Sequence, residues 1–357
     1  MNPVPGSSAS GRLILRDRLA REAEERSRLA PAAFRSSDSR GRARPEEPDG
    51  MRTAFERDRD RILHSKAFRR LKHKTQVFVN PEGDHYVTRL THALQVTQVA
   101  RAIAKALGLN ETLAEAIALA HDVGHTPFGH TGEDALAPYF EGGWHHSHQG
   151  VRIYEVLEDC NLTWEVRDGI RAHTWKIEPP PATPEGLCVR FADRIAYLTH
   201  DALDALRAGV LGVGELPSAT RRHLGEPGTE WIGRMIHAVV EHSVETGTLT
   251  MAPETLDVMQ ELRAFMFERV YATGDNARRK DAAIEVIRRL MDHYRAHPEE
   301  IPETYRDPAA DATSQAADWV AGMTDRFALA AHDRLVRPRL LEMPPLPGEP
   351  DLGTPTP

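Results

Sequence analysis

Residues 91–124 read THALQVTQVARAIAKALGLNETLAEAIALAHDVG, and this stretch decides the fold class. In its first half, apolar residues recur every three or four positions among Thr, Gln, Arg and Lys, which is typical of an amphipathic helix. That helix is expected to end at Gly108. Asn110 is a suitable N-cap for a second, more apolar helix that closes at Gly124. The stretch therefore predicts two consecutive helices.

The same helical period dominates the rest of the chain. Residues 52–71 place an apolar stripe among charged side chains, which again indicates a helix. Further helices are predicted at 12–29, 147–159, 164–174, 186–208, 228–245, 253–270, 276–296 and 312–334. Strand signals are few, and a Thr/Val/Phe run followed by NPEGD predicts at most one short β-hairpin near 75–88. The predicted fold class is all-α.

Composition divides the chain into three parts. Residues 1–50 are rich in Ser, Pro, Gly and Arg and are interpreted as a basic, partly irregular arm. Residues 51–335 form the predicted helical domain. Residues 336–357 are rich in proline, and we expect this tail to be disordered.

Overall composition favours a soluble protein. The chain has 357 residues, of which 27% are charged, and no apolar run approaches the length of a membrane span. We therefore expect no membrane contact. Cys160 and Cys188 are the two cysteines, and they do not form a metal-type pair. Such cysteine usage suits a reducing cytoplasm.

Charge is distributed unevenly along the chain. Residues 11–74 carry 19 Lys and Arg against 11 Asp and Glu, although the whole chain has a net charge of −8. This basic region suggests a polyanionic ligand, either nucleotide phosphates or nucleic acid. A solvated, Arg-rich helix surface explains the same charge equally well.

His121 and Asp122 stand side by side where the second helix must end. Neighbouring side chains in a helix diverge by about 100° and do not normally share a ligand. Gly124 and Pro127 release the backbone within one turn, so the imidazole and the carboxylate can converge on one metal ion. An isolated His–Asp pair is more often a polar helix cap, and its meaning depends on what surrounds it.

Other chemistry-bearing residues surround this pair in sequence. His92 lies in the preceding helix, and Asp193 stands in the otherwise apolar run FADRIAYL, where an unpartnered carboxylate would be costly. Asp193, Tyr197 and Asp201 are spaced i, i+4 and i+8, on one helix face. Further titratable residues follow the pair, among them His125, His130, Glu133, His145, His146 and His148.

The order H…HD…D, here His92, His121–Asp122 and Asp193, resembles that of the HD-domain phosphohydrolases. Longer blocks are more specific and are similar to the deoxyguanosinetriphosphate triphosphohydrolase-like family. They are SRGRARPEE, FERDRDRILHSKAFRRLKHKTQVF, DHYVTRLTHALQVTQVAR, AHDVGHTPFGHTGE and FADRIAYLTHDALDA. These blocks run in family order over roughly residues 12–290. The resemblance implies an HD phosphohydrolase domain over 51–335, with its metal core at 85–205.

The resemblance also implies a divalent metal ion held by His92, His121, Asp122 and Asp193. Imidazole and carboxylate ligands suit Mn²⁺, Mg²⁺, Fe²⁺ or Zn²⁺. The implied reaction is water attack at the α-phosphorus of a deoxynucleoside triphosphate (dNTP), which releases a deoxynucleoside and inorganic triphosphate.

Catalytic and binding roles follow from the same family positions. His130 and Glu133 match the acid–base pair that protonates the leaving alkoxide, with His125 beside them on phosphate. Arg89, His146 and Arg194 are expected to bind phosphate, because a triphosphate needs cationic partners. Gln76, Tyr197 and Asp201 match the positions that hold the deoxyribose. Ser147 stands where the family has Asn, which leaves the contacts of that segment open.

Two other functions remain open from the sequence. One is another HD-domain phosphohydrolase, such as a 5′-nucleotidase or a phosphodiesterase. The other is a nucleic-acid-binding regulatory protein with a vestigial metal site. The resembled family also implies a homo-oligomer, often a hexamer, and the basic arm is a candidate for contact with a neighbouring subunit or single-stranded nucleic acid. The motifs do not specify the preferred base, the native metal or allosteric activation by a nucleotide.

Overall fold

The computed structural model describes residues 13–76, 87–271 and 275–336. Within these residues the chain forms fifteen α-helices and no β-strand, which confirms the all-α prediction. The predicted hairpin near 75–88 is represented by one antiparallel bridge between Thr75 and Thr88. Its residues 77–86 lie outside the described residues.

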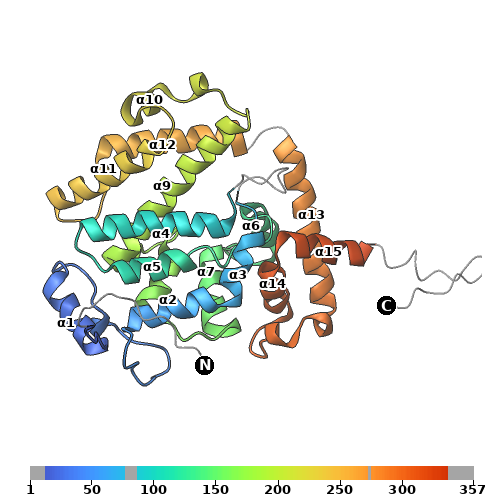
Figure 1. The fold of residues 1–357 in the computed structure, drawn as a ribbon. Helices are drawn as coiled ribbons and strands as arrows, with labels where there is room; N and C mark the ends of the chain where they lie inside the picture. The colour runs from blue at the N-terminus through green and yellow to red at the C-terminus, as the bar shows by residue number, and fades with distance from the viewer. Residues whose placement is uncertain (1–12, 77–86, 272–274, 337–357) are drawn as a thin grey trace, which may run out of the picture.

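The centre of the fold is a layer of three helices: α4 (Arg89–Ala106), α5 (Glu111–Ala120) and α9 (Pro184–Arg207). They pack against one another, and α2 (Ala54–His64) covers α5 (Figure 1). Asn110 caps α5 as predicted, because its side chain accepts hydrogen bonds from the backbone N–H groups of Thr112 and Leu113. The apolar faces of these helices are fully buried at residues such as Val96, Ile117 and Ile195.

A second hydrophobic core lies at the C-terminal side. It is formed by α13 (Asp275–Ala296), α14 (Ala312–Gly322) and α15 (Asp325–Val336), which cluster to the right in Figure 1. The short helix α6 (His130–Leu136) packs against α13. Phe128, Leu136 and Trp144 belong to this core, whereas the side chains of α4, α5 and α9 belong to the first. The segment after Asp122 therefore crosses from one core to the other.

The remaining helices surround the central layer: α1 (Arg18–Arg28), α3 (Lys66–Arg70), α7 (His146–Arg152), α8 (Trp164–Ala172), α10 (Ser218–Leu224), α11 (Glu230–Thr246) and α12 (Pro253–Met266). Helix α8 packs on α5, α7 and α9, while α10, α11 and α12 form a lobe at the far end of α9 (Figure 1). A helix long and apolar enough to span a bilayer is not found in the part of the chain that the structure describes.

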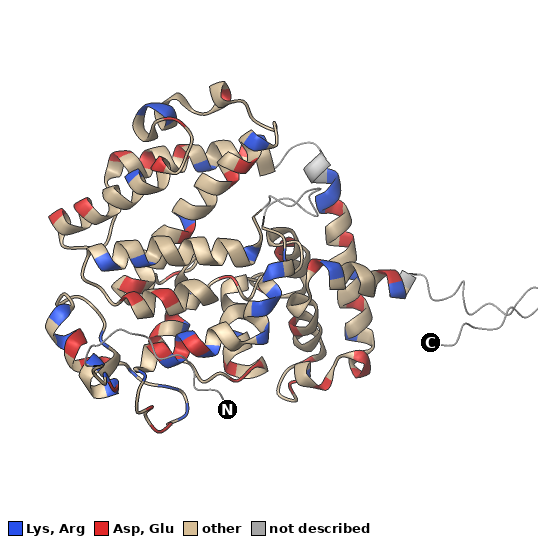
Figure 2. Cartoon of the chain, viewed as in Figure 1, with Lys and Arg blue, Asp and Glu red and all other residues tan. Residues whose placement is uncertain are grey.

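The N-terminal segment is attached to the fold by ion pairs. Arg42 pairs with the buried carboxylate of Asp58, which also accepts hydrogen bonds from the backbone and hydroxyl of Thr163. Figure 2 shows acidic and basic residues interleaved over this region. Other arginines of residues 11–74 pair locally as well: Arg18 with Glu22, Arg21 with Glu56, Arg52 with Asp49, and Arg57 and Arg61 with Glu46. All of these acidic partners lie within residues 11–74, so the pairs leave the excess of basic residues unchanged, and contact with nucleic acid stays a prediction.

Candidate active site

The four predicted metal ligands meet between α4, α5 and α9. His92 Nε2 lies 3.1 Å from Asp193 Oδ1 and 3.9 Å from Asp122 Oδ2. His121 Nε2 lies 3.3 Å from Asp122 Oδ1 and 3.7 Å from Asp193 Oδ1. His92, His121 and Asp122 are buried, and the side chain of Asp193 is 20% exposed. Residues spread over 102 positions of sequence thus converge on one point.

The donor set fits a divalent cation. His121 Nδ1 lies 2.6 Å from the carbonyl oxygen of Ala118, so this nitrogen carries the proton and Nε2 presents its lone pair. That Nε2 is buried, faces the two carboxylates and has no hydrogen-bond partner among the described residues. A lone pair directed at two anions without a proton between them is stabilised by a cation. Mixed nitrogen and oxygen ligands of this kind are typical of first-row metal sites.

The helix break after α5 is enforced by close packing. A Cβ atom at Gly124 would collide with the carbonyl oxygen of His146 and the backbone of Gly150. At Gly129 the backbone has φ +59°, and a Cβ atom there would lie 2.5 Å from Arg89 Nη2. These two glycines allow the loop between α5 and α6 to wrap around the site. Lys74 ties the loop to the C-terminal helices, because its Nζ donates to the carbonyls of His125 and of Ala321 on α14.

Asp122 is held in its charged form by its neighbours. Burial by itself would raise its pKa, but His121, His125 and Arg89 hold it well below the usual value. Arg89 Nη1 donates to Asp122 Oδ2 over 2.7 Å, and His125 Nε2 lies 3.1 Å from Oδ1. Burial is likewise outweighed at Asp193, whose pKa is lowered chiefly by the hydrogen bond to His92. Both carboxylates are therefore ready to bind a cation.

A second cluster surrounds Glu133 on α6. Its Oε1 lies 2.8 Å from His125 Nδ1, 3.0 Å from His130 Nδ1 and 2.9 Å from His146 Nδ1. Burial would raise the pKa of Glu133, but the charges of His146, His125 and His130 hold it well below its usual range. The His130 side chain is 67% exposed, whereas that of Glu133 is only 10% exposed. His130 is thus the solvent-facing member of a buried charge network.

His125 connects the two clusters. Its Nε2 lies 3.1 Å from Asp122 Oδ1 and its Nδ1 lies 2.8 Å from Glu133 Oε1. Its ring stacks on that of His146 with a centroid distance of 3.8 Å. Burial, followed by the charges of Arg89 and His146, lowers the pKa of His125 to about 3. The predicted metal ligands and the predicted acid–base pair are therefore linked through His125.

His173, which the sequence reasoning did not single out, also belongs to this network. It follows α8, and its Nδ1 lies 2.8 Å from the carbonyl oxygen of Ile170. Its Nε2 lies 3.1 Å from His146 Nε2, and its ring centroid is 5.0 Å from that of His121. Burial and the charges of His121 and His146 lower its pKa to about 3. The sequence feature that could have indicated His173 is its place at the end of a predicted helix, which it shares with His121.

Three of the six predicted sugar and phosphate residues lie on α9: Arg194, Tyr197 and Asp201. Asp193, Tyr197 and Asp201 share this helix with the expected spacing. Asp201 is buried and accepts a hydrogen bond of 2.6 Å from Tyr271. Burial raises the pKa of Asp201 to about 7, although this hydrogen bond opposes the shift. Tyr271, at the end of the π-helical segment Phe267–Tyr271, thus contacts a residue of the predicted sugar site.

The other residues predicted to contact the substrate differ in their own interactions within the protein. The guanidinium carbon of Arg194 lies 3.8 Å from the ring centroid of Trp175, a cation–π contact. Gln76 Oε1 is buried without a hydrogen-bond partner in the described part of the chain, and so is the hydroxyl of Ser147. Arg89 and His146 lie within the charge network itself. The structure therefore gathers Arg89 and His146 beside the metal ligands.

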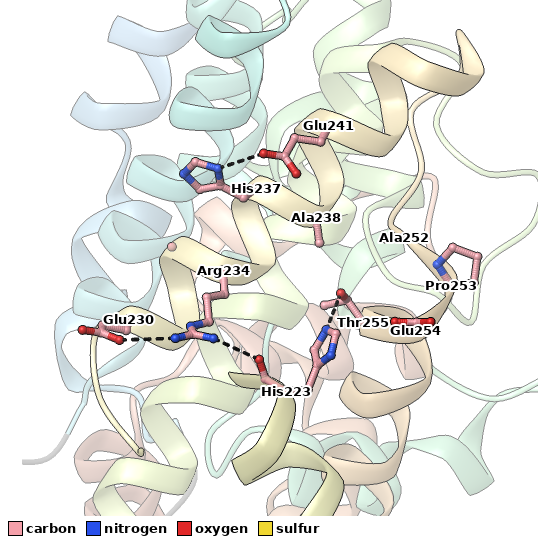
Figure 3. A pocket seen from close by; sticks show the side chains of 11 residues that line it. His223, Glu230, Arg234, His237, Ala238, Glu241, Ala252, Pro253, Glu254 and Thr255 are labelled. Atoms are coloured by element: carbon pink, nitrogen blue, oxygen red, sulfur yellow. Dashed lines mark hydrogen bonds and ion pairs between the residues drawn. The ribbon is translucent and has the colours of Figure 1, made fainter. Parts of the chain in front are cut away.

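A separate pocket lies between α10, α11 and α12. Its lining includes His223, Arg234, His237 and Thr255 (Figure 3). His223 Nε2 is 2.8 Å from Thr255 Oγ1, so part of the lining is paired internally. It contains no predicted site residue and belongs to the lobe formed by these three helices.

Comparisons with known proteins give the same assignment over most of the chain. The HD domain family model matches residues 89–198, and the phosphohydrolase-associated domain model matches residues 249–334. A deoxyguanosinetriphosphate triphosphohydrolase-like protein from Caldanaerobacter subterraneus subsp. tengcongensis is 46% identical over 316 residues, covering 87% of this chain and 93% of that protein. Proteins described by the same words from Desulfatibacillum aliphaticivorans and Clostridium perfringens are 44% and 41% identical. They are covered over 95% and 96% of their lengths, and they cover 87% and 89% of this chain.

Proposed function

Because this chain belongs to the deoxyguanosinetriphosphate triphosphohydrolase-like family and carries its HD domain, we propose that it hydrolyses dNTPs to deoxynucleosides and inorganic triphosphate. The coarser assignment, a nucleotide phosphohydrolase, rests on the family. The finer proposal is supported chiefly by one observation. The buried His–Asp cluster is connected through His125 to a second cluster in which Glu133 contacts the exposed His130.

The proposed cation site consists of His92, His121, Asp122 and Asp193. These residues would hold a divalent ion, and the chemistry it would supply there is Lewis acidity toward a phosphoryl oxygen and a lower pKa for a water molecule. Arg89 contributes to the site by donating to Asp122, which fixes the carboxylate and favours its ionised form. The nitrogen-containing ligand set favours Mn²⁺, Fe²⁺ or Zn²⁺, with Mg²⁺ as a further candidate.

His130 is the proposed general acid. Cleavage between the α-phosphorus and the 5′-oxygen releases an alkoxide of high pKa, which needs a proton as it departs. With Nδ1 directed at Glu133, His130 presents Nε2 to solvent and to the substrate. The charge of Glu133 stabilises the protonated ring and orients it. His125 lies between Glu133 and Asp122 and is proposed to fix the position of the Glu133 carboxylate relative to the cation site.

The triphosphate and the sugar are assigned to residues on both sides of the cation site. Arg89, His146 and Arg194 are the proposed phosphate contacts, because a triphosphate carries about four negative charges and needs several donors. Gln76, Tyr197 and Asp201 are the proposed deoxyribose contacts. In this assignment Asp201 accepts a hydrogen bond from the sugar in addition to the one from Tyr271.

The test is a product analysis with each of the four dNTPs and added Mn²⁺. Ion-exchange chromatography should detect inorganic triphosphate and the matching deoxynucleoside in equal amounts. With ¹⁸O-labelled water, the label should appear in triphosphate and not in the deoxynucleoside, because water attacks phosphorus. Pyrophosphate with a deoxynucleoside monophosphate would overturn the proposed reaction. The Asp193→Asn variant, purified in parallel, controls for contaminating phosphatases.

A further inference from the structure

A tryptophan on the loop between α8 and α9 stacks on the guanidinium of Arg194. The ring centroid of Trp175 lies 3.8 Å from the guanidinium carbon, which is the distance of a close cation–π contact. Trp175 lies outside the family-like sequence blocks, in residues 173–183, which connect the two helices. The contact thus joins a loop residue to the residue that follows Asp193 on α9.

Trp175 is itself held in place against α9. Its indole N–H donates to the carbonyl oxygen of Arg190 over 2.9 Å, and its ring meets that of Phe191 edge-on, with a centroid distance of 5.3 Å. Ile177, two residues further along the loop, is buried. Because a hydrogen bond and packing fix the indole ring, its face offers the Arg194 side chain one defined position.

Stacking leaves the charge and the donors of Arg194 available. A guanidinium stacks through its flat face, whereas its five N–H donors lie in the plane and point outwards. Arg190, one turn earlier on α9, has a carboxylate partner in Glu178 at 3.6 Å. Arg194 has no such carboxylate partner in the described part of the chain, and its Nε is buried there without a hydrogen-bond partner. The aromatic face therefore holds this side chain without neutralising it.

We propose that Trp175 is a positioning residue, which holds the guanidinium of Arg194 ready for the triphosphate of the substrate. The inference rests on the proposed function, because Arg194 acts there as a phosphate contact. A free arginine side chain loses rotamer entropy when it binds an anion, whereas a stacked one has lost part of that entropy beforehand. Removal of the ring should therefore weaken phosphate binding more than it slows the chemical step.

The experiment measures the binding of inorganic triphosphate, which needs no turnover. Isothermal titration calorimetry is carried out on the full-length protein, with the same excess of Mn²⁺ in cell and syringe. Trp175→Leu should bind triphosphate about 3- to 30-fold more weakly than wild type, a range set by the strength of a cation–π contact. Trp175→Phe keeps an aromatic face and should recover most of the affinity.

A matched control is available elsewhere in the chain. Trp164 stacks on Arg40 with a distance of 3.7 Å from guanidinium carbon to ring centroid, and both tryptophans are half-buried. Trp164 contains no predicted site residue among its stacking partners, so Trp164→Leu removes an equivalent contact away from the site. This variant should bind triphosphate as the wild-type chain does.

A double-mutant cycle separates positioning from general support of the fold. Arg194→Gln should weaken triphosphate binding by itself, and adding Trp175→Leu should then cause less than about a twofold further loss. Circular dichroism and a thermal melt establish that each variant is folded. A folded Trp175→Leu that binds triphosphate like wild type, or that loses the same factor with and without Arg194, overturns the proposal.

Kinetics with a dNTP give a second readout. Trp175→Leu should raise KM and change kcat by less than about twofold, because the contact serves binding and not the chemical step. A lower kcat with an unchanged KM would contradict the assigned role. If product analysis overturns the proposed reaction, the calorimetric cycle still decides whether Trp175 positions Arg194 for a polyphosphate.

Discussion

The carboxylate of Asp325, at the start of α15, accepts a hydrogen bond of 3.0 Å from the backbone N–H of Phe128. Phe128 has φ +62°, an uncommon conformation for a residue with a side chain. The other oxygen of Asp325 accepts from the backbone N–H of Thr75 over 2.9 Å and from its hydroxyl. Because Phe128 precedes His130 by two residues, a C-terminal helix holds the loop that carries the proposed general acid.

We therefore expect Asp325→Asn to impair turnover without removing metal. The Asn amide has only one oxygen. Its NH₂ group must therefore face either the Phe128 N–H or the Thr75 donors, which lose the acceptor that the carboxylate provided. Losing such buried hydrogen bonds costs about 1–3 kcal/mol, measurable as a lower urea midpoint, and kcat should fall more than metal content. A variant with wild-type kcat would show that the loop does not depend on this contact.

Glu133→Gln should retain its metal and lose rate. The substitution removes the charge that stabilises protonated His130, and general acid–base catalysis typically contributes about 10²–10⁴-fold. Metal analysis and steady-state kinetics on the same sample separate the two effects. If the metal were lost together with the rate, Glu133 would belong to the ligand set and its assigned role would be wrong.

Asp122→Ala should lose metal and activity together. Its carboxylate lies against His121, His125 and Arg89, so removal also leaves the buried Arg89 without its 2.7 Å partner. The measurement is the metal content after dialysis, with a thermal melt to establish folding. Retention of a full complement of metal by the folded variant would exclude Asp122 as a ligand.

Stability should depend on pH through Glu185. This carboxyl is fully buried, and burial raises its pKa to about 7. Its Oε1 accepts from the backbone N–H groups of Asn110 and Phe34, both over 3.0 Å, whereas Oε2 has no hydrogen-bond partner in the described residues. Since the folded chain binds this proton more tightly than the unfolded chain, its contribution is complete below about pH 4.5 and is lost as the pH rises through about 7.

Glu185→Gln should remove that dependence, because a Gln oxygen can still accept both backbone hydrogen bonds. Relative to wild type, the variant should gain up to about 3 kcal/mol between pH 5 and pH 8, at about 1.36 kcal/mol per pKa unit. Urea unfolding at the two pH values measures the difference. Parallel pH profiles for the two proteins would contradict the assignment.

The sequence predicted those features that depend on local pattern. The apolar period placed α4, α5 and α9, and the i, i+4, i+8 spacing placed Asp193, Tyr197 and Asp201 on one helix. Predicted helices 52–71 and 312–334 are each divided, because hydroxyl side chains start a new helix within them. Ser65 accepts from the backbone N–H of Phe68, and Thr324 accepts from that of Phe327. The sequence alone does not show whether a Ser or Thr within a helical pattern caps a new helix or continues the old one.

Features that depend on long-range packing were not accessible in the same way. His173 meets His146 and His121 only because α8 packs against α5 and α7. Nothing in its own surroundings, RAHTW, indicates that contact. Likewise, the apolar pattern predicted one helical domain. It could not show that Phe128 and Leu136 pack in the second hydrophobic core and not in the first.

The division of the site between two cores has a consequence for heat inactivation. The proposed metal ligands are anchored in the core of α4, α5 and α9, whereas His130 and Glu133 lie on α6, which packs against α13. If the C-terminal helices unfold first, the proposed acid–base pair is displaced and catalytic activity is lost, while a cation bound in the first core is retained. Inactivation would then precede metal release on a temperature ramp, and the metal content of a stored sample would overstate the fraction of molecules able to turn over.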